Sequence, residues 1–261
     1  MRIFFIICFI ISQLSFSQND IVYKKVASTT LEADSFYGVD DFLNLYFSKK
    51  NVLYKQTDKT TYQYNNLVLS NIASVDILNP LRITVFYKKL NTAEVLDNNL
   101  NSVLEINFSL LTNFKNIQFA TTANSNNNWV FDMNAQQLFI HDINKAEFLP
   151  IGFPIQETVI DMKSNYNFCW LLTSKHILKY NTYGSLLSKI PFENGKTMSS
   201  YKNNVVIVTT NNKIYNLNQT ELKAISLPES ILIQDIFLNK ENLYIFDGTN
   251  KLTTYSKQNI E

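Results

Sequence analysis

Four aspartates recur ahead of similar β-rich stretches of the sequence, in the contexts VDD, VDI, IDM and QDI: Asp40, Asp76, Asp161 and Asp235. Asp161 and Asp235 stand nine residues before the apolar centre of the following stretch, whereas Asp76 and Asp40 stand seven and six residues before theirs. If these carboxylates converge, their like charges raise each other's pKa and favour a bound cation. The alternative, which we favour, is that each aspartate caps loop amides within its own repeat.

Other reactive side chains are sparse, and we expect no catalytic residue, no metal site and no cofactor. The two histidines, His141 in LFIHDI and His176 in SKHILKY, are too few for a zinc site, which takes three or four protein ligands. Serine nucleophile elbows, glycine-rich phosphate loops and CxxC pairs are absent from the sequence. Cys169 lies between Phe168 and Trp170 in an apolar run, which predicts a buried, unreactive thiol.

The elements that must position these residues form a repeat with a period near 40 residues. Each unit has an apolar run, a short polar break and a second alternating run, which together predict a β-hairpin. Successive first runs are 37, 46, 41, 36 and 38 residues apart, counted from their apolar centres, which are Tyr46, Ile83, Trp129, Trp170, Val206 and Tyr244. A further strand candidate precedes each hairpin and another follows it. Four short antiparallel strands repeated in this way are typical of β-propeller blades.

The count of units and the closure of the ring follow from the two ends of the repeat. The last unit, residues 231–258, shows three strands and then stops. Residues 20–31, DIVYKKVASTTL, are rich in β-formers and have no hairpin of their own, so we expect them to supply the outer strand of the last blade. The sequence therefore predicts an all-β propeller of six blades, or seven if a degenerate unit is hidden. Asparagine pairs such as Asn211-Asn212 are expected to close hairpins in place of glycine.

Residues 1–17 are predicted to be a signal peptide rather than part of the fold. Arg2 precedes an apolar stretch, and small residues stand before Gln18 where a signal peptidase cleaves. An uncleaved anchor or a buried N-terminal strand is the alternative. Cys8 has no small residue in front of it, which argues against a lipoprotein site. We assign residues 18–261 to a single domain, and no second stretch is long and apolar enough to span a bilayer.

The charge balance excludes nucleic acid as a partner. Removing the leader removes Arg2, one of 23 basic residues, and leaves as many basic residues as the 22 acidic ones. Arg82 is then the sole arginine of the chain. A nucleic-acid binder needs a positive field and usually arginine forks, neither of which this composition provides.

Two segments carry a resemblance to known propeller repeats: VIDMKSNYNFCWLLTSKHILKYN (159–181) and IQDIFLNKENLYIFDGTNKLTTYS (233–256). They resemble the two-component-regulator and quinoprotein-like propeller families, although the Asp-x-x-Gly turn of those families is mostly missing. These families include sensors, scaffolds and enzymes, so the resemblance implies a fold and not an activity. Gln18 after the cleavage site and the abundance of Asn, Lys and Ile resemble exported proteins of Bacteroidota-type genomes.

The sequence favours an exported, non-catalytic propeller that serves as a platform for a protein partner in the cell envelope. We expect it in the periplasm or associated with the outer membrane. The platform role is expected because fixed loops on a rigid ring present a broad binding surface and no group of reactive residues appears in the sequence. The alternative is a propeller enzyme, or a binder of a small ligand or cation, that uses the mouth of the central channel. In that case Asp161 and Asp235 would serve as acid and base or as cation ligands.

Overall fold

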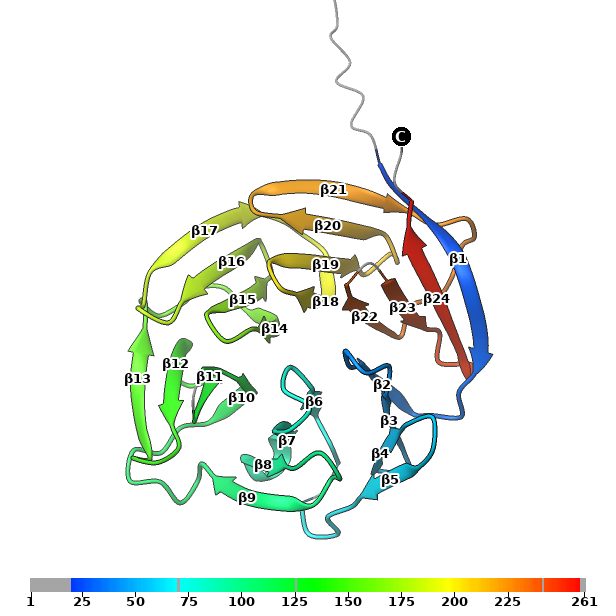
Figure 1. Cartoon of the computed structure of the whole chain (residues 1–261). Coiled ribbons are helices and arrows are strands. Elements are labelled where there is room, and N and C mark those ends of the chain that lie inside the picture. Colours follow the sequence, from blue (N-terminus) through cyan, green and yellow to red (C-terminus); the bar gives the residue numbers. More distant parts are fainter. Residues whose placement is uncertain (1–19, 70, 125, 241, 259–261) are drawn as a thin grey trace, which may run out of the picture.

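The computed structural model describes residues 20–69, 71–124, 126–240 and 242–258, and in them the chain forms strands arranged around a central axis (Figure 1). The predicted signal peptide lies outside the described residues. The described part contains 24 strands and one 3-10 turn, η1 (Lys88–Leu90). Among these residues, the structure contains no helix with the length and apolar character needed to cross a membrane.

Four sheets are separate blades of four antiparallel strands, in which the chain runs from the innermost strand outward. The first comprises β2 (Ser35–Val39), β3 (Leu45–Lys49), β4 (Val52–Gln56) and β5 (Thr61–Tyr64). The second comprises β6 (Ser74–Asp76), β7 (Ile83–Tyr87), β8 (Thr92–Leu96) and β9 (Ser102–Asn107). The third comprises β10 (Ile117–Thr122), β11 (Asn127–Asp132), β12 (Gln137–Asp142) and β13 (Glu147–Ile151). The fourth comprises β14 (Val159–Ser164), β15 (Phe168–Thr173), β16 (His176–Asn181) and β17 (Leu186–Pro191).

The remaining eight strands form one continuous sheet in the order β18-β19-β20-β21-β1-β24-β23-β22. One half comprises β18 (Gly195–Tyr201), β19 (Asn204–Thr209), β20 (Ile214–Asn218) and β21 (Glu221–Ser226). The other comprises β22 (Asp235–Asn239), β23 (Asn242–Phe246), β24 (Lys251–Lys257) and the N-terminal strand β1 (Ile21–Thr30). A short parallel pairing joins the halves, with Ile21 opposite Ile225 and Val22 opposite Ser226.

The structure confirms the all-β propeller and corrects the number of blades. Six or seven separate blades were expected, but the hydrogen-bonded sheets are four separate blades and one sheet of eight strands. The physical reason is β1, which is long enough to pair with β24 along most of its length and with β21 at its start. The prediction that the N-terminal segment closes the ring is confirmed, because β1 lies antiparallel to β24 as the outer strand beside the last hairpin (Figure 1).

The core lies between neighbouring sheets, where apolar side chains of the middle strands interlock. Between the third and fourth blades, Trp129 contacts a cluster that includes Met162, Cys169 and Leu171, all of them buried. Burial raises the pKa of the Cys169 thiol well above its usual value, so the thiol stays protonated. The prediction that this cysteine is buried is confirmed. Asn212 adopts a left-handed conformation with φ of 59°, which confirms that asparagine closes the β19–β20 turn.

Candidate functional site

Asp161 links two neighbouring sheets through their innermost strands. It lies in β14 and is 8% exposed. Its Oδ2 accepts hydrogen bonds from the Thr197 hydroxyl and the Met198 amide of β18, both at 2.8 Å. Its Oδ1 accepts hydrogen bonds from its neighbour's amide, at Met162, and from the Lys163 ammonium at 3.1 Å. One carboxylate therefore satisfies two amides on two different inner strands.

Asp76 and Asp235 make the same kind of bridge at two other junctions of the ring. Asp76 Oδ2 accepts a 2.6 Å hydrogen bond from the Thr122 amide of β10, and Asp235 Oδ2 accepts a 2.9 Å hydrogen bond from the Phe36 amide of β2. Burial raises the pKa of both carboxyls, and these amide hydrogen bonds oppose the rise. At three junctions, an inner-strand aspartate thus receives an amide from the inner strand that follows around the ring.

Asp40 acts within its own blade. It follows β2, is buried, and its Oδ1 accepts 2.9 Å hydrogen bonds from the Phe42 and Asn44 amides of the β2–β3 turn. Its Oδ2 accepts hydrogen bonds from the Asn44 side chain and, at 3.0 Å, from the Tyr46 hydroxyl. Asp40 therefore fits the loop-capping alternative that the sequence favoured. The inter-sheet bridges of the other three aspartates are an arrangement that neither sequence alternative described.

A lysine of the chain supplies positive charge near these bridges. Lys163 Nζ lies 3.1 Å from Asp161 Oδ1, and the same ammonium lowers the pKa of Asp76 and of Asp235 against the effect of burial. Among the described residues, no three His, Cys, Asp or Glu side chains are grouped so that they could hold a metal ion. A ligand-binding role for the four aspartates stays a prediction. In the structure, Asp76, Asp161 and Asp235 join neighbouring inner strands, and Asp40 caps the turn after its own strand.

A different polar pair lies buried between the second and third blades. Asn128 on β11 and His141 on β12 face each other across the ladder and are 0% and 1% exposed. Within the described part of the chain, neither the Asn128 amide group nor either His141 ring nitrogen has a hydrogen-bond partner. The imidazole instead contacts the rings of Phe108 and Phe148. Burial lowers the pKa of His141 to about 4, although the nearby Asp142 charge opposes this effect.

The lowered pKa of His141 predicts a loss of stability in mild acid. An unfolded histidine takes up a proton near its ordinary pKa of 6.5, whereas folded His141 does so only near pH 4. The free energy of unfolding should therefore fall as the pH drops from 6.5 towards 4, by up to about 1.4 kcal/mol per pH unit from this group. Urea unfolding across this range should show a shallower pH profile for His141→Phe than for the parent.

The matched control for this prediction is the second histidine. His176 lies on β16, where its Nδ1 is 2.7 Å from Glu157 Oε1, so it is not isolated as His141 is. The His176→Gln protein should retain the fall in the free energy of unfolding between pH 6.5 and 4 that His141 causes. Parallel profiles for the parent and His141→Phe between pH 4 and 6.5 would contradict the assignment.

One end of the ring carries the connections from each outer strand to the next inner strand, and we call it the connection face. Strand direction alternates within every blade, so these connections and the turns between second and third strands all lie at the same end. Four connections, residues 65–73, 108–116, 152–158 and 227–234, display large exposed apolar side chains. These are Leu67, Val68, Leu110, Phe114, Phe153 and Leu232, with Leu67 91% and Phe153 88% exposed.

Charge is scarce on these four connections. They contain only Lys115, Glu157 and Glu229 among their charged residues. Glu157 pairs with His176 and Lys189, and Glu229 pairs with Lys25 of β1 at 2.9 Å. The exposed apolar side chains therefore stand on connections that are poor in charge, although the turns between second and third strands at the same end add Lys50, Lys88 and Lys89. These side chains were not among the residues predicted from the sequence, although uncharged runs such as NNLVLSNIA (65–73) indicate them.

The opposite end of the ring carries the turns between first and second strands, and we call it the inner-hairpin face. It also exposes apolar side chains, namely Phe42, Leu43, Leu81 and Tyr166. Charged groups lie close to them. Lys240 Nζ is 4.0 Å from Asp41 Oδ1, and the charges of Asp76 and Arg82 both act on the Tyr166 hydroxyl. Charged groups are therefore present at both ends of the ring, and the four connections are distinguished by the few charged residues that they carry themselves.

Comparisons with known proteins agree on the fold. No family model matches the chain, and no curated protein matches it in sequence. A member of the DUF4221 family from Bacteroides vulgatus has a TM-score of 0.64 at 9% identity, over 92% of this chain and 99% of that one. A catalytically inactive variant of virginiamycin B lyase from Staphylococcus aureus, solved with quinupristin, has a TM-score of 0.60 at 11% identity, over 88% and 98%. BamB from Moraxella catarrhalis has a TM-score of 0.52 at 9% identity, over 90% and 99%.

These likenesses cover nearly the whole of each neighbour, so the similarity extends over a complete domain. At identities of 8–12%, they establish the architecture and leave family membership open. The resemblance to two-component-regulator and quinoprotein-like repeats, and the Bacteroidota-type origin, therefore stay predictions. The chain has the β-propeller fold.

Proposed function

We propose that this protein is an exported, non-catalytic β-propeller whose connection face binds a partner protein in the cell envelope. The observation that carries the proposal is a set of exposed apolar side chains at one end of the ring. They lie on four connections that contain few charged residues. Soluble monomers seldom expose large contiguous apolar patches, and such patches commonly mark interaction sites. Three of the four connections, β5–β6, β9–β10 and β13–β14, follow one another around the ring.

The chemistry of the connection face defines the partner. Its side chains gain free energy by leaving water, at about 25 cal/mol per Å² of apolar surface buried. The four connections offer few charges for an ionic partner to match, so the partner surface that covers them should be apolar as well. A rigid ring holds the connections in place before binding, which reduces the conformational entropy that association costs.

Export belongs to the same proposal. Residues 1–17 have the charged start, apolar stretch and small residues of a signal peptide, and residues 18–261 would then form the mature domain. The periplasm or the outer-membrane surface is the compartment we propose. A chain with a single cysteine after the leader can fold there without an intrachain disulfide.

The fold alone does not choose between binding and catalysis, because a virginiamycin B lyase has the same architecture. The connection face favours binding, since it presents apolar surface rather than a group of reactive side chains. Use of the channel mouth by a small ligand or cation, with Asp161 and Asp235, remains the alternative.

The proposal predicts that polar substitutions on the connection face abolish capture of a partner and leave the fold unchanged. A triple variant, Leu67→Ser, Val68→Ser and Phe153→Ser, changes side chains that are all highly exposed. Affinity purification from envelope extracts should recover a partner with the parent and lose it with this variant. Phe42→Ser with Leu43→Ser, on the inner-hairpin face, is the matched control and should retain the partner. Equal recovery with both variants, or recovery of the parent protein alone under gentle conditions, would overturn the proposal.

A further inference from the structure

Exposed apolar and basic side chains gather at one sector of the connection face, over the second and third blades. Leu110 and Phe114 stand exposed on the β9–β10 connection, and Leu90 ends the η1 turn and is also exposed. The turn and the connection lie against each other, because the Asn91 side chain donates a 2.7 Å hydrogen bond to the Lys115 carbonyl. We give the name lysine patch to Lys88, Lys89, Leu90, Leu110, Phe114 and Lys115.

The lysine patch carries positive charge that is left without an ion pair. Among the described residues, no carboxylate pairs with any of its three lysines. On the strands beside the patch, Glu94 and Asp132 are buried, and Glu105 is exposed on the outer strand β9, at the flank of the ring. Basic groups therefore outnumber exposed acidic groups in this sector.

In both loops of the patch, an exposed apolar side chain stands next to a lysine. Leu90 follows Lys88 and Lys89, and Phe114 precedes Lys115. The Lys115 ammonium lies 5.1 Å from the centre of the Phe139 ring, so the exposed pair in the η1 turn supplies most of the charge that a surface can reach. Lysine is depleted at protein–protein interfaces, whereas at a bilayer its ammonium reaches the headgroups while neighbouring apolar groups enter the acyl boundary.

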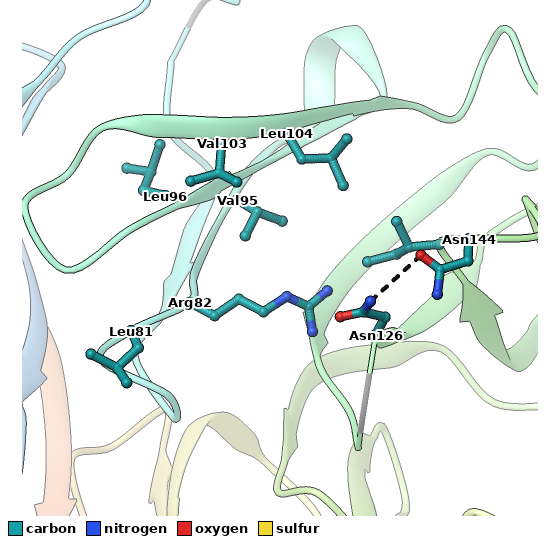
Figure 2. A pocket seen from close by; sticks show the side chains of 9 residues that line it. Leu81, Arg82, Val95, Leu96, Val103, Leu104, Asn126 and Asn144 are labelled. Atoms are coloured by element: carbon teal, nitrogen blue, oxygen red, sulfur yellow. Dashed lines mark hydrogen bonds between the residues drawn. The ribbon is translucent and has the colours of Figure 1, made fainter.

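Two cavities of the ring lie away from the patch. One of about 300 Å³ opens between the same two blades at the inner-hairpin face, where Figure 2 shows Leu81, Val95 and Leu104 around it. The other, of about 860 Å³, lies beside residues 227–232. No described residue of the patch lines either cavity. Small ligands are held in cavities, whereas protruding apolar and basic side chains suit a lipid surface.

We propose that the lysine patch binds the surface of an anionic phospholipid bilayer. Its three apolar side chains would lie at the boundary between headgroups and acyl chains, with Lys88 and Lys89 beside the lipid phosphates. This inference goes beyond the proposed function, because it assigns one sector of the connection face to lipid and leaves the other three connections to the partner protein.

Flotation of the mature protein, residues 18–261, with vesicles tests the proposal. Phosphatidylcholine vesicles that contain about 30% phosphatidylglycerol should bind the protein at low salt, at least about tenfold more tightly than phosphatidylcholine alone. Salt at about 1 M, where charges are screened within about 3 Å, should remove most of this binding. Lys88→Gln with Lys89→Gln should weaken it at least about tenfold. Leu110→Ser with Phe114→Ser should also weaken it, which adsorption by charge alone does not predict.

Lys175→Gln with Lys213→Gln is the matched control for the lysine pair. Both lysines are exposed in turns between second and third strands at the same end of the ring, outside the patch, so binding should be unchanged. Equal loss with both lysine pairs, or equal binding to the two kinds of vesicle, would overturn the proposal. Retention on immobilised polyglutamate without binding to vesicles would assign the patch to an acidic protein and would overturn it too. Because the vesicles contain no protein, none of these results decides the capture test of the proposed function.

Discussion

Asp161→Asn is expected to lower the free energy of unfolding by about 2–4 kcal/mol, measured by urea or guanidinium unfolding. In the parent, both carboxylate oxygens of Asp161 accept hydrogen bonds. Asparagine replaces one of these oxygens with an NH2 group, which would face donors and cannot accept their hydrogen bonds. On one side these donors are Thr197 and Met198, and on the other they are the Met162 amide and Lys163. In either orientation at least one buried amide loses its acceptor, and two inner strands lose part of their connection.

The same bridge predicts a coupling that a local effect would not produce. Thr197→Val removes one donor to Asp161 Oδ2, so a double-mutant cycle of the two changes should give a coupling energy of about 0.5–3 kcal/mol. Asp58→Asn is the matched control, because Asp58 lies exposed in the turn before β5, and its effect should stay within about 0.5 kcal/mol. An Asp161→Asn protein as stable as the Asp58→Asn protein would show that the bridge does not stabilise the ring.

The repeat could be predicted because its strongest sequence signal comes from the best-buried strands. Every predicted apolar centre, from Tyr46 to Tyr244, falls in the second strand of its unit: β3, β7, β11, β15, β19 or β23. Each of these strands pairs with another strand on both edges and packs against a neighbouring sheet on both faces. Its residues are therefore mostly apolar, and many are β-branched or aromatic. The closing strand was predictable for the complementary reason, because residues 20–31 are a strand candidate without a hairpin to pair with.

The merged sheet could not be predicted, since it depends on two residue pairs between β1 and β21 rather than on any pattern in either segment. The bridging aspartates could be predicted only in part. Asp76 bonds an amide 46 residues later and Asp161 one 37 residues later, which is about one repeat length. The spacing was therefore in the sequence, but whether a carboxylate turns to its own loop, as Asp40 does, or to the next inner strand depends on backbone geometry that composition does not encode.

The buried pair of Asn128 and His141 is the least predictable feature. Both residues stand in runs, NNNWVFD and LFIHDI, whose other members are equally compatible with either face of a strand. Only the register of β11 against β12 places them opposite each other and turns both towards the second blade. A slip of one residue in a strand would turn its side chains to the opposite face of the sheet. The burial of Asn128 and His141 is therefore a consequence of strand register.

Removal of β1 is expected to have the largest effect on the protein. A variant that begins at Leu31 should lose most of the stability of a variant that begins at Asp20, which for a domain is about 5–15 kcal/mol in total. β1 pairs with β24 from Tyr23 to Thr30, and the buried Tyr23 side chain packs with Ile225, Ile236 and Tyr255. Without β1, the edge of β24 is unpaired and the junction with β21 is lost, so the shortened protein should also self-associate.

Sedimentation and thermal unfolding of the two variants measure this effect. A peptide added in trans tests whether any loss comes from the missing strand or only from the shorter chain. A synthetic peptide of residues 20–31 added in excess should restore a monomer that unfolds cooperatively, because it supplies the same hydrogen bonds to β24 in trans. A scrambled peptide of the same composition should not. If the variant lacking β1 stays monomeric and unfolds at the same temperature as the longer one, the N-terminal strand lies on the ring without holding it closed, since an essential strand could not be removed at no cost.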